Sequence, residues 1–289
     1  MLDMKYESPQ TVEAAVALLA AEGPSAKVFA GGTDLMVLMN EELIEPTLLV
    51  DIKKIAEARQ ITFGDDFVQI GAAVTGAEMG EHEKLKAAWP GVVEAVELIG
   101  SDQVQGRATI GGNLCNASPA ADSVPALIAA DAKASIIGPG GVREQAVAEM
   151  LTGPGKTSLA AGEFVISIIL PNRPHLSGDA YLRFIPRTEM DIAVVGAGAL
   201  VTLNADGTCA DARLALGAVA PTARLVEDVA NIMVGNKLDA AVFEALAAAA
   251  SATCSPIDDK RGTIKFRTKV AGVLARRAMA IAWQRAETK

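Results

Sequence analysis

Two glycine pairs constrain the folding of this chain more than any other feature of its sequence. The longer motif, "TIGGNLCNASPAAD" (residues 109–122), contains no run of side chains that build a core, and a shorter one, "AGGTDL", occupies residues 30–35. A glycine pair lets the backbone adopt positive φ and approach a ligand closely, with consecutive N–H groups directed at one point. One such turn can hold a phosphate, whereas two turns that face each other can hold both phosphates of a pyrophosphate.

Hydrogen-bonding side chains accompany both pairs. They are Thr33 and Asp34 after the first pair, and Thr109, Asn113 and Asn116 around the second. Asp122, at the end of the longer motif, can accept hydrogen bonds from ribose hydroxyls. Either pair alone is more often an ordinary turn. Because each follows an apolar segment and precedes polar residues, the two together favour a dinucleotide cofactor.

The two pairs fall in separate units of alternating strands and helices. The first unit has a predicted helix at 7–23, which begins at Ser8 and Pro9 and ends at Gly23, then strands at 26–32 and 46–52 around a helix at 34–43. The second has a strand at 67–74, helices at 75–89 and 90–105, a helix and strand within 121–138, and a strand at 163–171.

The chain changes character after a predicted linker at residues 172–179. Strand-like segments flank "NADGT" (204–208), which indicates a hairpin through Asp206 and Gly207. An alanine-rich helix is predicted at 239–253, and a final amphipathic helix carries one apolar face made of Phe266, Val270, Leu274, Ala278 and Ile281. The pattern predicts an α+β, α/β-rich protein: residues 1–172 form one domain of two α/β lobes (about 1–56 and 57–172), and residues 173–289 form a second.

Composition excludes several classes of function. The chain has 51% hydrophobic and 21% charged residues, which predicts a well-buried globule. Its net charge of −9 argues against nucleic acid and anionic lipid as general partners. We see no signal peptide and no apolar run of membrane-spanning length, so the expected location is the cytoplasm. Three scattered cysteines and two histidines make a metal site built by this chain alone unexpected.

From residue 260 onward the sequence has nine Lys or Arg residues against one acidic residue. This basic stretch is either a solvated helix face that balances an acidic body or a docking surface for a partner.

Four features mimic functional motifs. "GPGKTS" (153–158) ends like a phosphate-binding loop but has Met150 where that motif needs glycine, and "GAGALV" (196–201) has Val201 in the third glycine position of a dinucleotide fingerprint. We interpret the latter as small residues in a tightly packed hairpin. Cys115 has no neighbouring histidine and is interpreted as space-filling, and His82 as an exposed residue of a charged helix.

"AGGTDL" together with "TIGGNLCNASPAAD" resembles the FAD-binding subunit of molybdenum hydroxylases, the family of carbon monoxide dehydrogenase, xanthine dehydrogenase and quinoline oxidoreductase. The likeness extends through "ESPQTVEAAVALL", "LTGPGKTSLAAGEFVISIILP", "RFIPRTEMDIAVVGAGA" and "PIDDKRGTIKFRTKVAGVLARRAM". It implies a two-lobed PCMH-type FAD-binding domain followed by a smaller C-terminal α+β domain with an antiparallel sheet and helices.

The resemblance also implies which residues contact the cofactor. Arg183 stands where family members often have a lysine that contacts the flavin ring, and Ile99 where some relatives place an aromatic residue. No catalytic or metal-binding residue is implied on this chain. The implied cofactor-binding residues are Lys27, Val28, Phe29, Ala30, Gly31, Gly32, Thr33, Asp34, Leu35, Ile99, Thr109, Ile110, Gly111, Gly112, Asn113, Asp122, Val165 and Arg183.

By the same resemblance, the chain is an electron-transfer subunit whose FAD passes electrons from 2Fe-2S clusters to an external acceptor. A large subunit with molybdopterin cytosine dinucleotide and a small subunit with two 2Fe-2S clusters are the implied partners, in a dimer of heterotrimers. The alternative is a self-contained FAD-dependent reductase of the related cell-wall type, which would need a catalytic acid at the flavin. A non-enzymatic flavin carrier is a third possibility. The hydroxylated substrate and the final acceptor are left open.

Overall fold

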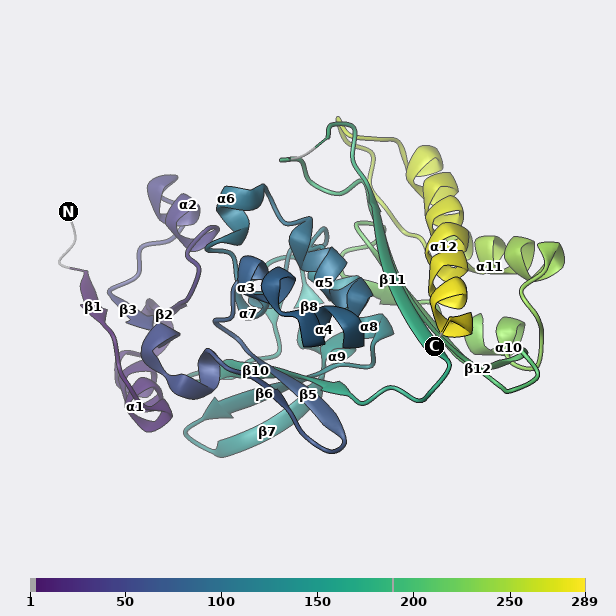
Figure 1. Cartoon of the computed structure of the whole chain (residues 1–289). Helices are drawn as coiled ribbons and strands as arrows, with labels where there is room; N and C mark the ends of the chain where they lie inside the picture. The colour runs from purple at the N-terminus through teal and green to yellow at the C-terminus, as the bar shows by residue number, and fades with distance from the viewer. Residues whose placement is uncertain (1–3, 189, 289) are drawn as a thin grey trace.

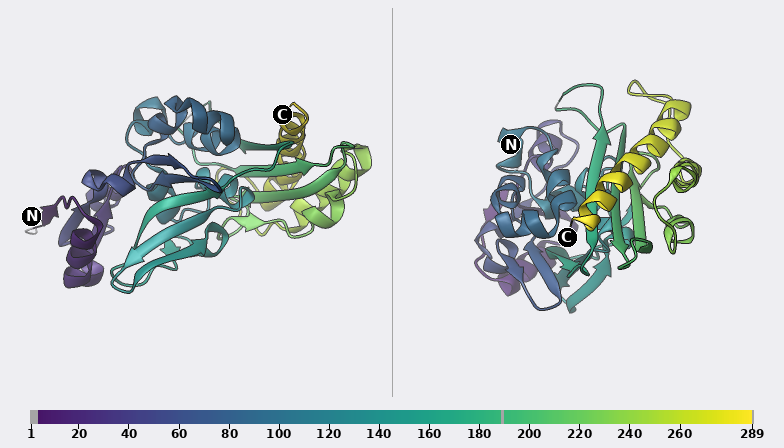
Figure 2. Two further views of the ribbon diagram at one scale, coloured as in Figure 1. Left: turned by 60° about the horizontal axis from the view of Figure 1, so that its bottom comes forward. Right: turned by 45° about the vertical axis from the view of Figure 1, so that its right-hand side comes forward.

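The computed structural model describes residues 4–188 and 190–288, and their main sheets follow one another along the molecule (Figure 1). A small parallel sheet lies at the N-terminal end, a five-stranded sheet lies in the middle, and a four-stranded sheet lies at the C-terminal end. Figure 2 shows the same succession from two further directions, with the last helix lying across the C-terminal sheet. The mixed helix and strand content confirms the predicted α+β class.

The N-terminal lobe is a three-stranded parallel sheet with strand order β1-β3-β2. Its elements are β1 (Lys5–Glu7), α1 (Val12–Glu22), the 3₁₀ turn η1 (Gly23–Ser25), β2 (Ala26–Phe29), α2 (Leu35–Asn40) and β3 (Leu48–Asp51). The predicted start of the first helix was wrong, because Thr11 rather than Ser8 caps α1. Its hydroxyl accepts a hydrogen bond from the N–H of Ala14 at 3.2 Å.

The middle sheet has strand order β4-β5-β10-β6-β7, and neighbouring strands are antiparallel. Its strands are β4 (Ile61–Phe63), β5 (Phe67–Gly71), β6 (Lys133–Gly138), β7 (Gly141–Ala146) and β10 (Phe164–Pro171), reached from β3 through η2 (Ile52–Lys54) and η3 (Ala56–Ala58). Strand β10 is central and buried along most of its length. This explains why its sequence is an apolar run, interrupted by Ser167 alone, rather than an alternating one.

Short helices cover this part of the chain where the sequence predicted longer ones. Between β5 and β6 they are α3 (Gly76–Glu81), α4 (Glu83–Ala88), α5 (Pro90–Glu97), α6 (Asp102–Gln105), α7 (Ile110–Cys115) and α8 (Ser123–Ala129). The predicted helix at 75–89 breaks at His82, whose ring nitrogen Nδ1 accepts from Leu85 N at 3.2 Å and whose ring stacks on Phe63. The expectation that His82 is merely exposed was therefore wrong: it is half-buried and caps α4.

The C-terminal sheet is antiparallel, with strand order β11-β12-β13-β14. Its strands are β11 (Ser177–Phe184), β12 (Val195–Leu203), β13 (Cys209–Gly217) and β14 (Arg224–Leu225), followed by α10 (Val229–Met233), α11 (Ala240–Ala252) and α12 (Ile264–Glu287). The predicted hairpin is confirmed, since Asn204 N donates to Thr208 O at 2.8 Å and Gly207 has φ +77°.

Helices pack on both faces of the C-terminal sheet, with α12 on one face and α5 and α8 on the other (Figure 1). The contact with α8 explains the glycines of "GAGALV". A Cβ at Gly198 would lie 2.5 Å from the carbonyl oxygen of Pro125, so only glycine allows this approach. The interpretation of this motif as tightly packed small residues is confirmed.

The buried face of α12 is broader than the stripe predicted from sequence. Leu274 and Ala278 are buried as expected and Val270 and Ile281 are partly buried, but Phe266 is 41% exposed. The main buried residues of the helix also include Arg267, Ala271, Ala275, Met279, Ala282, Trp283 and Ala286. The buried face turns this way because α12 lies along β11 and β12 while α11 covers its flank.

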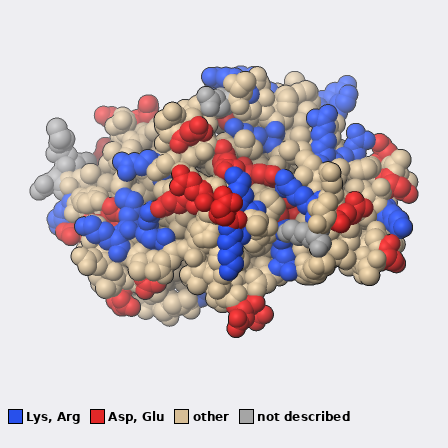
Figure 3. All heavy atoms as spheres, viewed as in Figure 1, with Lys and Arg blue, Asp and Glu red and all other residues tan. Residues whose placement is uncertain are grey.

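Charges are unevenly distributed on the face shown in Figure 3. Acidic side chains gather over the region of α3 to α5 in the middle of the view, and basic side chains gather toward the upper right, along α12. Within residues 4–188 and 190–288, no helix is long and apolar enough to cross a membrane.

Candidate functional site

A cavity of about 710 Å³ lies between the N-terminal lobe and the middle of the molecule. This volume falls within the range of about 300–1,000 Å³ that is typical of ligand pockets. Residues that follow β2 form one wall, and residues of α7 and of the segment before β10 form the others. Both glycine pairs line the cavity.

The first glycine turn is wedged between two parts of the chain. A Cβ at Gly31 would lie far inside van der Waals contact with the carbonyl oxygen of Arg107, just before the second motif. Gly32 has φ +76°, and a Cβ there would lie 2.6 Å from the Phe29 ring. Both positions therefore require glycine. Gly31 does so because of its close approach to Arg107, and Gly32 because of its close approach to Phe29 and its positive φ.

This turn also has unused backbone donors. Among the described residues, no acceptor is found for the N–H groups of Gly31, Gly32 and Thr33, although all three residues line the cavity. Unpaired N–H groups in succession are suited to hold an anionic group.

The second glycine motif differs from the expected turn, because it opens the short helix α7. Thr109 caps this helix by accepting from Gly112 N at 3.0 Å, while Ile110 N and Gly111 N donate to Val74 O and Ala72 O. The two motifs are therefore not equivalent. The backbone N–H groups of the second motif already donate within the chain. This motif therefore contributes to the site a stretch of cavity wall without a side chain, at the exposed Gly112.

A polar contact joins the two motifs across the site. Asn116 Nδ2 donates to Asp34 Oδ1 at 3.0 Å, and removal from water raises the pKa of Asp34. Asn113 is turned the other way, since its Oδ1 accepts from both the backbone N–H and the hydroxyl of Ser123.

Most residues implied by the family resemblance line the cavity, but four do not. The lining includes Lys27, Val28, Ala30, Gly31, Gly32, Thr33, Asp34, Leu35, Ile99, Thr109, Gly111, Gly112, Asn113 and Val165. Phe29 instead packs beneath Gly32, and Ile110 is fully buried in the core. Asp122 and Arg183 also lie outside the lining.

Asp122 and Arg183 pair with each other. The guanidinium of Arg183 lies 2.9 Å from Asp122 Oδ2, and the Tyr181 hydroxyl donates to Asp122 Oδ1 at 2.8 Å. Burial raises the pKa of Asp122, and the Arg183 charge opposes this rise. The same cluster raises the pKa of Tyr181 well above its ordinary value, mainly through burial. This cluster connects the start of α8 to β11. The cofactor contacts expected of Asp122 and Arg183 stay predictions.

Sequence reasoning missed two groups of residues at the site. The segment Leu159–Phe164 lines the cavity, and Glu163 within it is held by Arg143 through two hydrogen bonds of 2.7 Å. Lys53 does not line the cavity, but its Nζ donates to Ala30 O at 3.0 Å, directly before the first glycine pair. The family-like stretch "LTGPGKTSLAAGEFVISIILP" contains the first group but only Val165 was assigned from it, and Lys53 had no sequence signal.

Two of the features that mimic functional motifs, Cys115 and "GPGKTS", also border the cavity. Cys115 lines it, and burial raises the pKa of its thiol to about 12, which leaves it protonated and a poor nucleophile. "GPGKTS" forms the tight turn between β8 (Leu151–Gly153) and β9 (Lys156–Thr157), where Gly155 N donates to Ala117 O at 2.9 Å. This supports the rejection of a phosphate-binding loop at that position.

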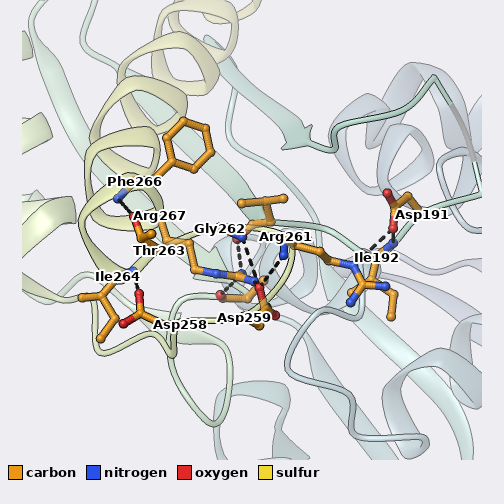
Figure 4. A network of polar contacts seen from close by, with 12 residues as sticks. Asp191, Ile192, Asp258, Asp259, Arg261, Gly262, Thr263, Ile264, Phe266 and Arg267 are labelled. Carbon is orange, nitrogen blue, oxygen red and sulfur yellow. Dashed lines mark hydrogen bonds and ion pairs between the residues drawn. The ribbon is translucent and has the colours of Figure 1, made fainter.

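Residues 190–194, the segment that precedes β12, contact the middle of the molecule near the cavity. Met190 N donates to Gly100 O at 3.3 Å, next to the cavity-lining Ile99. The segment is anchored by Asp191, which contacts Arg261 at 3.2 Å (Figure 4).

A second anchor holds the loop that carries Arg261. Arg267 of α12 is 4% exposed and donates to both carboxylate oxygens of Asp259, at 2.7 and 2.8 Å (Figure 4). The guanidinium also donates to Val194 O at 2.8 Å. The loop before α12 is therefore fixed to the end of the segment that reaches Gly100.

The fold and the cavity define a two-lobed dinucleotide-binding protein with an appended α+β domain. Residues 2–173 match the family described as "FAD binding domain in molybdopterin dehydrogenase", and residues 180–282 match the "CO dehydrogenase flavoprotein C-terminal domain". The chain belongs to this family of FAD-binding subunits of molybdenum-containing dehydrogenases, which are oxidoreductases. The resemblance seen in the glycine motifs is confirmed.

Relatives match over nearly the whole chain. The carbon monoxide dehydrogenase medium chain of Hydrogenophaga pseudoflava is 34% identical, over 97% of each chain. The 6-hydroxypseudooxynicotine dehydrogenase complex subunit alpha of Paenarthrobacter nicotinovorans is 32% identical, over 97% of this chain and 95% of that protein. In the solved structure of reconstituted CO dehydrogenase from Oligotropha carboxidovorans, one chain matches with a TM-score of 0.93, at 33% identity and 98% coverage of both chains.

Proposed function

We propose that this chain is the electron-transfer subunit of a multi-subunit molybdenum hydroxylase, and that it passes electrons from 2Fe-2S clusters on a small partner to an external acceptor. The observation that carries this proposal is a cavity lined by Gly31, Gly32 and Thr33, whose N–H groups have no acceptor among the described residues, in a chain that matches the medium chain of carbon monoxide dehydrogenase over 97% of its length. FAD, once bound, supplies redox chemistry that amino-acid side chains lack.

The residues present fit FAD. The amides of the first turn are available to hold the pyrophosphate, and the bare surface at Gly112 allows close approach from the opposite wall. Apolar groups such as Ile99 and Val165 line other parts of the cavity, and suit the ring systems of the cofactor. Within the chain we assign the FAD-binding domain to residues 1–172 and a supporting domain to residues 173–289.

The proposed partners are a large subunit with molybdopterin cytosine dinucleotide and a small subunit with two 2Fe-2S clusters. Relatives are named as a medium chain and as a subunit of a dehydrogenase complex, which supports a multi-subunit assembly. We propose a dimer of such heterotrimers located in the cytoplasm. Substrate hydroxylation then takes place on the large subunit.

Two preparations test this function: the full chain purified alone, and the chain purified as a tagged complex from its source organism. The lone chain is expected to bind one FAD, released by acid precipitation, to show only flavin absorption, and to hydroxylate no purine, aldehyde, N-heterocycle or carbon monoxide. The complex is expected to contain Mo, Fe and FAD, and its substrate is expected to bleach flavin and clusters together. Substrate turnover by the lone chain, or a tagged protein without partners, would favour a self-contained flavoenzyme.

A further inference from the structure

A polar cluster outside the cavity lining lies next to the first glycine turn. Lys53 Nζ donates to Ala30 O at 3.0 Å and lies 2.9 Å from Asp51 Oδ1. The same carboxylate oxygen accepts from Lys53 N at 2.9 Å, and the Tyr6 hydroxyl donates to the other oxygen of Asp51. The ammonium also lies 4.1 Å from the centre of the Phe29 ring, in the geometry of a cation–π contact.

This cluster is built to keep Lys53 in one place. The Asp51 side chain is 5% exposed, and its hydrogen bonds from Tyr6 and Lys53 outweigh the effect of burial, so that its pKa is lowered and the carboxylate stays ionised. Since Phe29 packs against Gly32 and Lys53 contacts both the Phe29 ring and Ala30 O, the lysine and the ring both support the turn. Gly31 in turn rests against the backbone of Arg107, which leaves the turn little freedom to rotate.

The direction of the Ala30 carbonyl determines the direction of the next amide. The peptide bond is planar and trans, so its C=O and N–H point in opposite directions. With Ala30 O held by Lys53, the N–H of Gly31 points away from the lysine. Lys53 is not part of the cavity lining, whereas Ala30 and Gly31 are, and the Gly31 N–H has no acceptor among the described residues.

We infer that Lys53 is a positioning residue for the FAD pyrophosphate: it fixes the Ala30–Gly31 peptide so that the amides of the first turn face the cavity. Asp51 and Tyr6 hold Lys53 in place. The inference rests on the proposed binding of FAD at this cavity, and it adds a residue that acts through the backbone and not through direct contact with the cofactor.

The test compares two neighbouring lysines in the full chain. Lys53→Met removes the ammonium and keeps a long side chain, and Lys54→Met makes the same change of net charge at an exposed residue with no described hydrogen bond or ion pair. FAD affinity is expected to fall at least ~10-fold in Lys53→Met, about 1.4 kcal/mol, and to change less than twofold in Lys54→Met. Lys53→Arg, which keeps a charged donor, is expected to recover most of the affinity.

A spectroscopic measurement separates positioning from general stability. The ³¹P resonances of bound FAD report the environment of its two phosphates, and at least one is expected to shift in Lys53→Met but not in Lys54→Met. If Lys53→Met does not fold, Tyr6→Phe replaces it as the test variant. Tyr6→Phe removes the hydrogen bond from the Tyr6 hydroxyl to Asp51 at the exposed strand β1, and it is expected to shift the same resonance by less. Unchanged FAD affinity and unchanged ³¹P shifts in a folded Lys53→Met chain would overturn the inference about Lys53 and leave the proposed function intact. Failure of the unaltered chain to bind FAD would overturn the proposed function as well.

Discussion

The glycines of the site have different physical reasons to be glycine, and this difference can be measured. At Gly31 a Cβ would collide with the Arg107 backbone, whereas at Gly112 a Cβ would lie 2.8 Å from the Thr109 hydroxyl oxygen and would meet no other described atom within 4 Å outside its own helix backbone and chain neighbours. Gly31→Val is therefore expected to destabilise the FAD-free chain by about 1–3 kcal/mol through overpacking. Gly112→Val is expected to cost less than about 1 kcal/mol, because its side chain enters the cavity.

Both substitutions are expected to abolish stable FAD binding. Urea unfolding of the FAD-free variants measures the first effect, and titration with FAD measures the second. Full flavin occupancy in Gly112→Val would show that the cofactor does not approach this wall of the cavity. Equal unfolding midpoints for the two variants would contradict the different packing of the two motifs.

Individual residues also show where sequence reasoning about the site succeeds. The glycine pairs and their neighbours can be recognised because the ligand-facing residues are contiguous in sequence. Lys53 and the Arg143–Glu163 pair cannot, since each acts on a residue 20 or more positions away, and only the folded chain brings them together. The pairing of Asp122 with Arg183 spans 61 positions and was hidden for the same reason.

At the scale of elements, local signals were reliable and cap positions were not. The hairpin at 204–208 and strand β10 could be predicted because turn chemistry and an apolar run are local properties. The glycine motif was expected to be a turn, yet Thr109 caps a helix whose Ile110 and Leu114 are buried at helical spacing. Arg267 could not be recognised as buried, because its partners Asp259 and Val194 belong to other segments.

The packing of α12 on β11 gives a prediction at this scale. A Cβ at Gly178 in β11 would overlap the carbonyl oxygen of Ala282, whereas a Cβ at Gly140 in the β6–β7 turn meets nothing within 4 Å. Gly178→Ala is expected to lower the free energy of unfolding by about 1–3 kcal/mol, because α12 must shift from the sheet. Gly140→Ala serves as the matched control, with an expected change within about 0.5 kcal/mol. Urea denaturation measures both, and equal midpoints would contradict the close approach of α12 to β11.

At the scale of the whole molecule, the cofactor site joins two parts of the chain. Cavity residues such as Lys27, Leu35 and Ile52 come from the N-terminal lobe, and others such as Ile99 and Thr109 come from the middle of the molecule. In the part of the chain that the structure describes, the sheet of the N-terminal lobe has three short strands, a size that gives little independent stability. A ligand that contacts both walls is therefore expected to stabilise this lobe more than the rest.

The C-terminal sheet is the part of the same chain with which the stabilisation of the N-terminal lobe by FAD can be compared. A second hydrophobic cluster, formed with α11 and α12, stabilises it without any residue of the cavity. Because FAD binds only the folded state, it is expected to add about 2.7 kcal/mol at a free concentration 100 times its dissociation constant. Hydrogen exchange should show where this stabilisation acts, with slower exchange upon FAD binding at residues 26–44 and 108–116 and little change in α12. Equal protection of α12, or none at residues 26–44, would show that the cofactor does not bridge the two walls of this cavity.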